Sequence, residues 1–327
     1  MSALADSSAP SNSGRRWQRV LGLLPVVALV AWAGVTEPEW AGPEGQSSPA
    51  AAPIGSHVEF RDTRIDESSG LVCSLRHPGI FWTHNDSLSA PRLYAVDSQG
   101  QTRAEIRLRD AANVDWEDMA CLRRPDGSAV LLVADIGDNL HLRSAIDLYE
   151  LAEPDLPPEP GREILVSPLR RWRARYPDGR HNAETLLVHP QTQRMMILTK
   201  DPSGHSRLYA FPASAKPGEV AVLELLTELN LPALPRLGKA PHHAQQTTGG
   251  AISADGRWLA VATYSYILEW ALPTDGDVAR ALTQPPVYWQ PPVTPQLEAI
   301  AYAQDGNSLW FSSERLPAGL WRMDLKR

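Results

Sequence analysis

The sequence is poor in cysteine, in helical periodicity and in clustered basic residues, and each absence argues against a class of protein. Cys73 and Cys121 are its only cysteines, so at most one intrachain disulfide can form. The net charge is −7, and the chain lacks the extended basic stripe that a nucleic-acid-binding surface needs. The short basic cluster Arg170–Arg175 is interpreted as a solvated outer strand. No Gly-x-Ser-x-Gly segment is present, which counts against serine esterase chemistry.

One pattern occurs five times between Ser69 and the C-terminus. It consists of a short apolar strand, a tight turn, a second strand and then a large aromatic side chain. Gly250, beside Thr247 and Thr248, starts one repeat, and polar residues start the other four: Ser69, Glu117, Glu184 and Glu298. The second strands are apolar, as buried strands should be, and cover Ile80–Thr83, Val130–Ala134, Met195–Thr199, Trp258–Thr263 and Leu309–Ser313. Such an internal repeat indicates a propeller or a solenoid.

The repeats predict an all-β fold, a five-bladed β-propeller with four strands in each blade and variable outer loops. The last repeat ends after its third strand, at Met323–Leu325, and an unpaired edge there would invite aggregation. The segment His57–Ile65 alternates as a strand does, and we expect it to close the ring by pairing near Leu320–Leu325. Splitting the long outer regions of the second or third blade would give six blades, which is the alternative.

The N-terminal region has the composition of an export signal. Arg15–Arg19 is basic, Val20–Val35 is apolar, and Ala31–Ala33 precedes Gly34, as in a secretory signal peptide. The apolar run is shorter than the roughly 20 residues that span a bilayer, but it has no polar break. Residues 1–35 are therefore either a signal peptide or an N-terminal membrane anchor, residues 36–54 a linker and residues 55–327 the propeller. In both cases we expect the propeller outside the cytoplasm, periplasmic or secreted.

The two cysteines occupy equivalent positions, each four residues after the start of its repeat. An oxidising compartment would favour a disulfide between them. A disulfide usually needs Cα atoms within ~6.8 Å, and neighbouring inner strands splay apart as they leave the axis. A disulfide and two buried free thiols are both compatible with the sequence.

Most of the strong polar clusters are predicted to lie on one face of the propeller. The first strand of each blade runs away from this face and the second strand returns to it, so the start of one and the end of the other lie together. Asp115–Glu117 and His181–Glu184 start repeats, and His84–Asp86, Asp135–Asn139 and Glu314-Arg315 end second strands. The turns at the opposite face carry only ordinary turn residues.

The equivalent glutamates predict a metal centre on the axis. Glu117, Glu184 and Glu298 would converge there, where they could not all stay ionised without a cation. Oxygen ligands, without a thiolate or a close histidine pair, favour Ca²⁺ over zinc. Ser69 and Thr248, or backbone oxygens, would complete the shell. The alternative is that these side chains form hydrogen bonds through trapped water and fill the channel.

Further polar side chains are expected around this centre. His84, His181, Lys200 and Arg315 are the candidate catalytic residues, because a metal ion with lysine and arginine suits an anionic substrate, above all a phosphoryl group. Lys200 and Arg315 could equally be ordinary surface charges. The candidate ligand-binding rim consists of six more residues, Asn85, Asp86, Asp135, Asp138, Asn139 and Glu314.

Several short segments resemble those of a known family. They are Glu67–Leu71, Trp82–Asp86, Asp115–Met119, Asp135–Asn139, His181–Glu184 and Glu298–Tyr302. They are similar to segments of secreted bacterial β-propellers that tend to carry a phytase-like or esterase-like label, and the similarity covers Val58 to the C-terminus. The resemblance implies the propeller and its polar face, whereas the activity in that label rests on analogy of fold.

The order of residues around the axis is also similar to the calcium centre of the five-bladed calcium-activated nucleotidases, or apyrases. Gly250 departs from that pattern in the fourth blade. Two functions fit the sequence: a calcium-dependent hydrolase of phosphoesters or related esters, and a non-catalytic propeller that binds a ligand or partner and uses calcium for rigidity. Paired carboxylates also leave a glycosidase as a weaker third hypothesis. In each case we expect a small anionic ligand or a partner on the polar face, and no nucleic acid.

Overall fold

A computed structural model describes residues 50–51, 54–159, 162–234, 242–291 and 296–325. All of them belong to one compact unit, Ser47–Arg327. The predicted signal peptide or anchor, and most of the predicted linker, lie outside the described residues. Within the described residues, no helix is both long and apolar enough to span a membrane.

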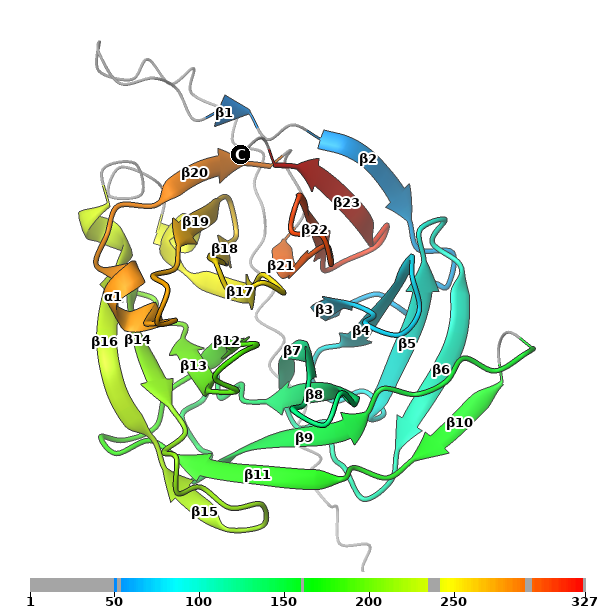
Figure 1. The fold of residues 1–327 in the computed structure, drawn as a ribbon, viewed down its shortest axis with the longest axis horizontal. Helices are drawn as coiled ribbons and strands as arrows, with labels where there is room; N and C mark the ends of the chain where they lie inside the picture. Colours follow the sequence, from blue (N-terminus) through cyan, green and yellow to red (C-terminus); the bar gives the residue numbers. More distant parts are fainter. Residues whose placement is uncertain (1–49, 52–53, 160–161, 235–241, 292–295, 326–327) are drawn as a thin grey trace, which may run out of the picture. The chain divides into compact units, whose positions relative to one another are not determined.

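Five antiparallel β-sheets surround a central axis (Figure 1), which confirms the predicted five-bladed β-propeller. In each sheet the strand nearest the axis comes from the start of a repeat. These inner strands are β3 (Ser68–Cys73), β7 (Trp116–Arg123), β12 (Ala183–Val188), β17 (Thr247–Ile252) and β21 (Leu297–Tyr302). The second strands are β4 (Ile80–Asn85), β8 (Ala129–Asp135), β13 (Met195–Thr199), β18 (Trp258–Thr263) and β22 (Ser308–Ser313).

The third strands carry the aromatic residue of each repeat. They are β5 (Arg92–Asp97), β9 (Ile146–Ala152), β14 (His205–Ala210), β19 (Ile267–Ala271) and β23 (Gly319–Asp324). The fourth strands of the first four blades are β6 (Thr102–Leu108), β11 (Arg170–Arg175), β16 (Glu224–Asn230) and β20 (Val287–Gln290). Three short strands extend the outer edges in parallel pairing, namely β1 (Ala50–Ala51), β10 (Glu163–Val166) and β15 (Val220–Val222). The long second and third repeats thus supply outer strands, and the described residues form five blades, not six.

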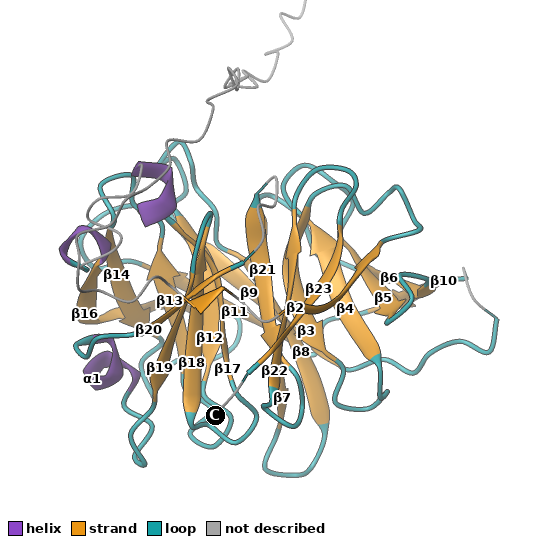
Figure 2. Ribbon diagram, turned by 90° about the horizontal axis from the view of Figure 1, so that it is seen from above, coloured by secondary structure: helices purple, strands orange, loops and turns teal. Residues whose placement is uncertain are grey.

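Helical structure is confined to the loops (Figure 2). Helix α1 (Val278–Leu282) connects β19 to β20, and its N-cap Asp277 accepts a hydrogen bond from the Arg280 N–H. Two short 3₁₀ helices, η1 (Leu231–Ala233) and η3 (His242–Gln245), lie between β16 and β17. The strands β4, β8, β12, β13 and β21 are buried along their whole length. Such burial explains their continuous apolar character, because neighbouring blades cover both faces of each sheet.

An N-terminal strand completes the fifth blade. Strand β2 (Ile54–Glu59) pairs antiparallel with β23, with Val58 opposite Leu320. The pairing partner is the predicted one, but the strand ends at Glu59 rather than at Ile65. Residues 61–65 lie outside the sheet, and Arg64 among them forms ion pairs with Asp62 and, across to β6, with Glu105.

The inner strands surround the axis. Every second side chain of a strand points to the same side, so the side chains that face the axis form successive levels along it. Below a polar level described in the next section lie Leu71, Met119, Leu186, Gly250 and Ile300, followed by Cys73, Cys121, Val188, Ile252 and Tyr302. Together with neighbouring residues they line a cavity of about 70 Å³. Of the two alternatives for the cysteines, the structure has the free thiols. Burial raises the pKa of Cys73 to about 12, so this thiol stays protonated.

One buried carboxylate joins three inner strands across the axis. Asp118 on β7 accepts hydrogen bonds at Oδ1 from the Met119 N–H and at Oδ2 from the Leu186 N–H of β12, both at 2.8 Å. It also accepts a hydrogen bond from the Gly250 N–H of β17. Burial raises the pKa of this fully enclosed carboxyl, and the backbone donors oppose that rise.

Replacing Asp118 should be costly, because Asp118→Ala would leave backbone N–H groups of three strands without a partner. We expect the free energy of unfolding to fall by at least about 3 kcal/mol, at roughly 1–3 kcal/mol for each buried unsatisfied group. Urea denaturation followed by tryptophan fluorescence would measure the loss. Glu219→Ala, at an exposed site, is the control and should change it little. Equal stability of the two variants would contradict the bracing role of Asp118.

The N-terminal strand should also matter for stability. A protein that begins at Phe60 would expose the edge of β23, whereas one that begins at Ile54 keeps the β2–β23 pairing. We expect the shorter protein to melt about 10 °C lower, since a whole strand contributes several kcal/mol. Differential scanning calorimetry would compare the two, and equal melting temperatures would show that β2 does not hold the ring closed.

Candidate functional site

Each inner strand has an irregularity at the same place, at its second residue. The pairing register between the first two strands of every blade shifts across this residue, which is the signature of a β-bulge. The five bulge residues are Ser69, Glu117, Glu184, Thr248 and Glu298, and all are buried. A bulge re-aims the side chain of its extra residue. The equivalent position in the fourth blade is therefore Thr248, and Gly250, the predicted start of that repeat, belongs to the apolar level below.

A second set of equivalent residues directly follows the second strand of each blade. They are Asp86, Ile136, Lys200, Tyr264 and Glu314. Three of them, Asp86, Lys200 and Glu314, are among the predicted site residues. The structure therefore places the predicted polar face at the bulged ends of the inner strands.

Lys200 provides a cation on one side of the axis. Its Nζ donates hydrogen bonds to Glu184 Oε1 at 2.5 Å and to Tyr264 Oη at 2.6 Å, and lies 4.7 Å from the centre of the Tyr264 ring. Burial opposes the charge on Lys200, but Glu184 and Glu298 keep its pKa well above the usual value. The axial glutamates of blades three and five are thus partly balanced by a residue of the protein itself.

Two of the remaining axial residues have neutral partners. Gln296 Nε2 donates to Glu298 Oε1 at 3.2 Å and to Glu314 Oε2 at 2.9 Å. Ser69 Oγ donates to the Glu117 carbonyl oxygen at 2.8 Å. Within the described part of the chain, Thr248 Oγ1 is buried without a hydrogen-bond partner.

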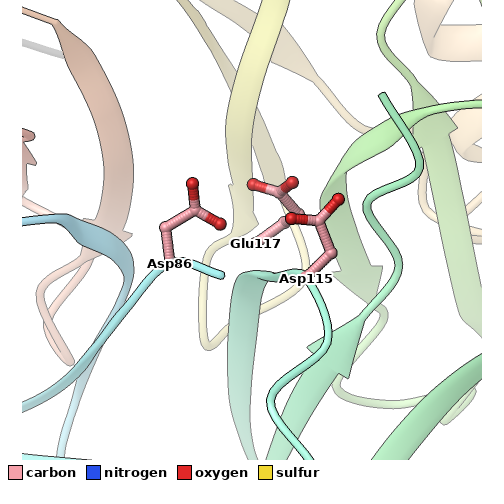
Figure 3. A group of neighbouring side chains, drawn as sticks. All are labelled: Asp86, Asp115 and Glu117. Atoms are coloured by element: carbon pink, nitrogen blue, oxygen red, sulfur yellow. The ribbon is translucent and has the colours of Figure 1, made fainter. Parts of the chain in front are cut away.

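Three carboxylates from the first and second blades come together (Figure 3). Asp86 follows β4, and Asp115 and Glu117 stand at the start of β7. One ligand oxygen from each lies within 4.8 Å of the other two, and among the described residues this is the one such group of acidic, histidine or cysteine side chains. We call these three residues the acidic triad. Of the three predicted axial glutamates, only Glu117 belongs to it.

The acidic triad is electrostatically strained when it is fully ionised. Burial, together with Glu314 and Asp115, raises the pKa of Asp86 to about 8. Burial also raises the pKa of Asp115 to about 6, although Arg143 opposes the shift. The pKa of Glu117 is raised by burial and then by Glu184 and Asp86. In the described structure, no lysine or arginine lies within salt-bridge distance of the three.

Gly137 leaves space beside the acidic triad because it has no side chain. A Cβ atom at this position would overlap Glu117 Oε1 and Asp115 Oδ2. Its backbone N–H donates to the Asp115 carbonyl oxygen at 3.1 Å, which holds the loop against the start of β7. A side chain here would fill the space between the two carboxylates.

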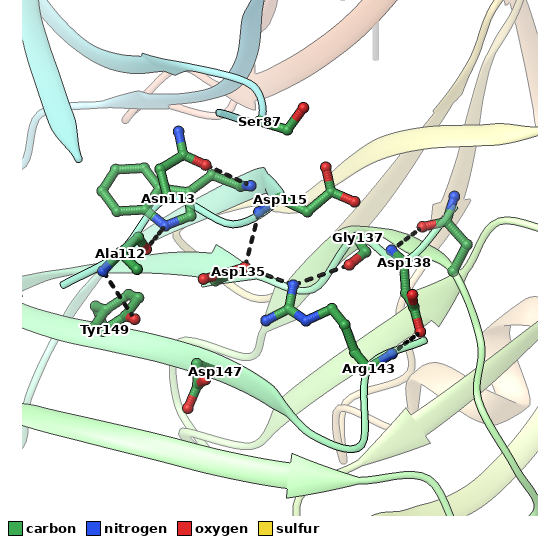
Figure 4. Close-up of polar contacts among 12 residues, drawn as sticks. Ser87, Ala112, Asn113, Asp115, Asp135, Gly137, Asp138, Arg143, Asp147 and Tyr149 are labelled. Carbon is green, nitrogen blue, oxygen red and sulfur yellow. Dashed lines mark hydrogen bonds and ion pairs between the residues drawn. The ribbon is translucent and has the colours of Figure 1, made fainter. Parts of the chain in front are cut away.

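The loop after β8 forms an ordered part of the rim (Figure 4). Asp135 Oδ1 accepts hydrogen bonds from Arg143 Nη1 at 2.6 Å and from the Asp115 N–H at 3.1 Å. Asp138 accepts hydrogen bonds from the backbone N–H groups of Leu142 and Arg143, and its own N–H donates to Asn182 Oδ1. Asn139 accepts a hydrogen bond from Asn182 Nδ2 at 3.1 Å. These predicted rim residues therefore shape the loop through their mutual contacts.

The predicted catalytic residues other than Lys200 lie elsewhere. His84 is fully buried; burial lowers its pKa to about 4, and its Nδ1 lies 3.1 Å from the Asn85 carbonyl oxygen. His181 lies just before β12, the inner strand of blade three, and contacts Asp178 and Tyr209. Arg315 is exposed and has a φ of 69°. Among the described residues, these three side chains and Lys200 do not form one hydrogen-bonded group.

The polar face also contains Asn85, a predicted rim residue, and two residues that were not predicted. Asn85 Nδ2 donates to the Arg64 carbonyl oxygen and to Asp66 Oδ1, so this rim residue holds two loops together. Asp115 and Tyr264 were not among the predicted site residues. Asp115 could have been found from its position just before the inner strand, where Glu67, Asn182 and Gln296 of other blades are also polar. Tyr264 follows its second strand in the same way as Lys200 does.

Comparisons with known proteins leave the family open. No protein-family model and no curated protein matches the chain. Hydrazine synthase from Kuenenia stuttgartiensis is similar in structure, with a TM-score of 0.39 and 9% sequence identity over 79% of this chain and 71% of that chain. A likeness of this size carries no functional argument, and the fold assignment rests on the strand pairing. The resemblance of the sequence segments to phytase-like propellers and apyrases stays a prediction.

The raised carboxyl pKa values predict how stability depends on pH without a metal ion. Asp86, Asp115 and Glu314 bind protons more tightly in the folded than in the unfolded protein, so their contribution is present at about pH 4 and is lost as the pH rises towards 8. We expect the melting temperature in EDTA to fall between pH 5 and pH 8, and Asp86→Asn to flatten this fall. Asp126→Asn, at a turn where the carboxylate is exposed, should leave the slope unchanged. A melting temperature that rises over this range in wild type would contradict the assignment.

Proposed function

We propose that the protein is an extracytoplasmic, calcium-binding β-propeller that hydrolyses phosphoester or related ester bonds at its polar face. The acidic triad carries this proposal: two blades bring the carboxylates of Asp86, Asp115 and Glu117 within one cation's reach of one another. The export segment expected in residues 1–35 supports the extracytoplasmic location, and the acidic triad would supply ligands for the calcium ion.

The residues of the triad fit a divalent cation with oxygen ligands. Carboxylates alone suit calcium better than zinc, which prefers nitrogen and sulfur donors. The space kept open by Gly137 lies against Asp115 and Glu117, where a Cβ atom would otherwise intrude. Burial raises the pKa values of Asp115 and Glu117, Arg143 and Lys200 only partly oppose these shifts, and a bound cation would stabilise the ionised carboxylates further.

The chain offers groups for ester chemistry next to the acidic triad. Bound calcium would polarise a phosphoryl oxygen and lower the pKa of a coordinated water. Lys200, held by Glu184 and Tyr264, keeps a positive charge on the other side of the axis, where it would attract an anionic substrate. Burial and Glu184 raise the pKa of Glu314 to about 7, so its carboxyl can accept or give a proton near neutral pH.

A non-catalytic propeller with structural calcium is the second candidate. It is favoured by the surroundings of two predicted catalytic residues: His84 is fully buried, and His181 contacts Asp178 and Tyr209. In that case the same face would bind a ligand or partner without turnover. Activity assays separate the two candidates, because only the first predicts a calcium-dependent rate on nitrophenyl phosphates and nucleotides.

Calcium binding should be visible as a gain in thermal stability. A cation that binds only the folded protein stabilises it by about 2.7 kcal/mol at a hundredfold excess over its dissociation constant. We expect millimolar calcium to raise the melting temperature of the wild type, and Asp115→Asn and Glu117→Gln to lose most of this rise. Asp66→Asn, an exposed carboxylate on the same face, is the matched control and should keep it.

The variant Glu184→Gln tests where the calcium ion binds. If calcium lies at the acidic triad, this variant keeps the calcium-dependent rise, although loss of the Lys200 contact lowers its melting temperature with or without calcium. If calcium lies at the centre of the predicted axial ring, the rise disappears in this variant too. A wild-type melting curve that is the same in calcium and in EDTA at neutral pH would refute the calcium proposal.

A further inference from the structure

Three sulfur-bearing side chains line the cavity at the end of the axis away from the acidic triad. Cys73 and Cys121 occupy equivalent positions on β3 and β7, and both line this cavity of about 70 Å³. Met119 also lines it and lies two residues before Cys121, so the two side chains point to the same side of β7. We call Cys73, Cys121 and Met119 the sulfur group. Both cysteines are free and half-buried, so solvent reaches them.

Hydrogen bonds hold β3 and β7, two neighbouring inner strands, together on both sides of the cysteines (Figure 1). Ser69 Oγ donates to the Glu117 carbonyl oxygen at 2.8 Å, four residues before each cysteine. Arg123 Nη2 donates to the Leu75 carbonyl oxygen at 3.0 Å, two residues after each cysteine. Burial raises the pKa of Cys121, and the Leu75 N–H, which lies beside the sulfur, partly opposes this rise. The Cys121 sulfur therefore lies against the segment that follows the other cysteine.

A buried carboxyl group lies beside the sulfur group. Glu153 Oε2 is 3.8 Å from Cys121 Sγ. The Glu153 carboxyl accepts hydrogen bonds from Ser74 Oγ, from the Leu75 N–H at 3.2 Å and from Trp82 Nε1 at 3.0 Å, so these donors fix its position. After burial, this carboxyl is the main cause of the raised pKa of Cys121. A thiolate at Cys121 would be repelled by Glu153 unless a cation were bound to the sulfur.

The charged groups near the other cysteine act in the same direction. Burial and then Asp305 raise the pKa of Cys73. Two arginines lie at this end of β3 and β7, but they bind oxygen atoms: Arg123 donates to two backbone carbonyl oxygens, and Arg76 to one carbonyl oxygen and to a carboxylate. Both thiols are thus poor acids without a metal ion, and a cation that binds them must displace their protons.

The donor atoms of the sulfur group select a soft cation. Thiolate and thioether ligands favour copper(I), whereas a zinc site usually has four ligands from cysteine, histidine or carboxylate side chains. Among the described residues that line the cavity there is no histidine, aspartate or glutamate. The cavity of about 70 Å³ is large enough for an ion, because a single water needs only about 10–15 Å³. Two cysteines and one methionine match the small coordination number of copper(I).

We propose that the sulfur group binds one copper(I) ion at the end of the axis opposite the acidic triad. Cys73 and Cys121 each release one proton to solvent and bind the ion as thiolates, and the Met119 thioether supplies the third ligand. The bound ion joins the inner strands of blades one and two. This site shares no residue with the proposed calcium site, so it goes beyond the proposed hydrolase and does not depend on it.

Metal titration of the full-length protein, reduced and kept under nitrogen, tests this site. Competition with the chelator bicinchoninate measures the dissociation constant of copper(I), and calorimetry with silver(I), which is not oxidised in air, measures the stoichiometry. We expect one ion per protein. Loss of a residue that only supports a metal ligand costs about 10–100-fold in affinity, so Cys73→Ala and Cys121→Ala should each raise the dissociation constant by at least about a hundredfold, and Met119→Leu by about tenfold.

The matched control for Met119→Leu is Met323→Leu, which replaces a fully buried methionine of blade five. This variant should bind copper(I) as the wild type does, and circular dichroism checks that every variant is folded. Undiminished binding in either cysteine variant, two independent ions per protein, or equal weakening in the two methionine variants would overturn the proposal. Protein isolated in air that shows no free thiol after denaturation would also overturn it, in favour of a disulfide. Failure of calcium binding alone would refute the proposed function and leave this site standing.

Discussion

The bulge at the second residue of every inner strand is the constraint on which the polar face depends. It breaks the pairing of the inner strand with its neighbour at the same place in all five blades. A regular strand would alternate its side chains without this displacement. The bulges gather five polar residues at one end of the axis, and the levels below them, from Leu71 to Tyr302, are mainly apolar. Polar chemistry is thereby confined to one face.

Burial at this end makes ionised side chains energetically costly. Their charges are balanced differently on the two sides of the axis. On one side Lys200 pairs with Glu184 and contacts Tyr264, so the protein supplies its own cation. On the other side Asp86, Asp115 and Glu117 meet without a salt bridge to any described lysine or arginine, and their pKa values are raised. An external cation is proposed for the second side because the first has no need of one.

The same half of the face combines acidic groups with exposed aliphatic side chains. Leu88, Leu140 and Leu316 lie on loops that hold Asp86, Asp138 and Glu314 in place. Exposed leucine contributes nothing to the stability of these loops, since it buries little surface.

The sequence by itself determined the number of blades, the polar face and four of the five positions around the axis, because each follows from local strand patterns that repeat; in the fourth blade the bulge places Thr248, not the predicted start Gly250, at the axial position. It could not determine which of these side chains meet. Asp115 lies beside Asp86 only because neighbouring blades converge, and Lys200 of blade three reaches Tyr264 only because blade four is adjacent. The sequence also could not show that the packing of blades one and two buries the predicted site residue His84 against Trp116. Contacts between blades depend on distances across the ring, and no local pattern in the chain encodes those distances.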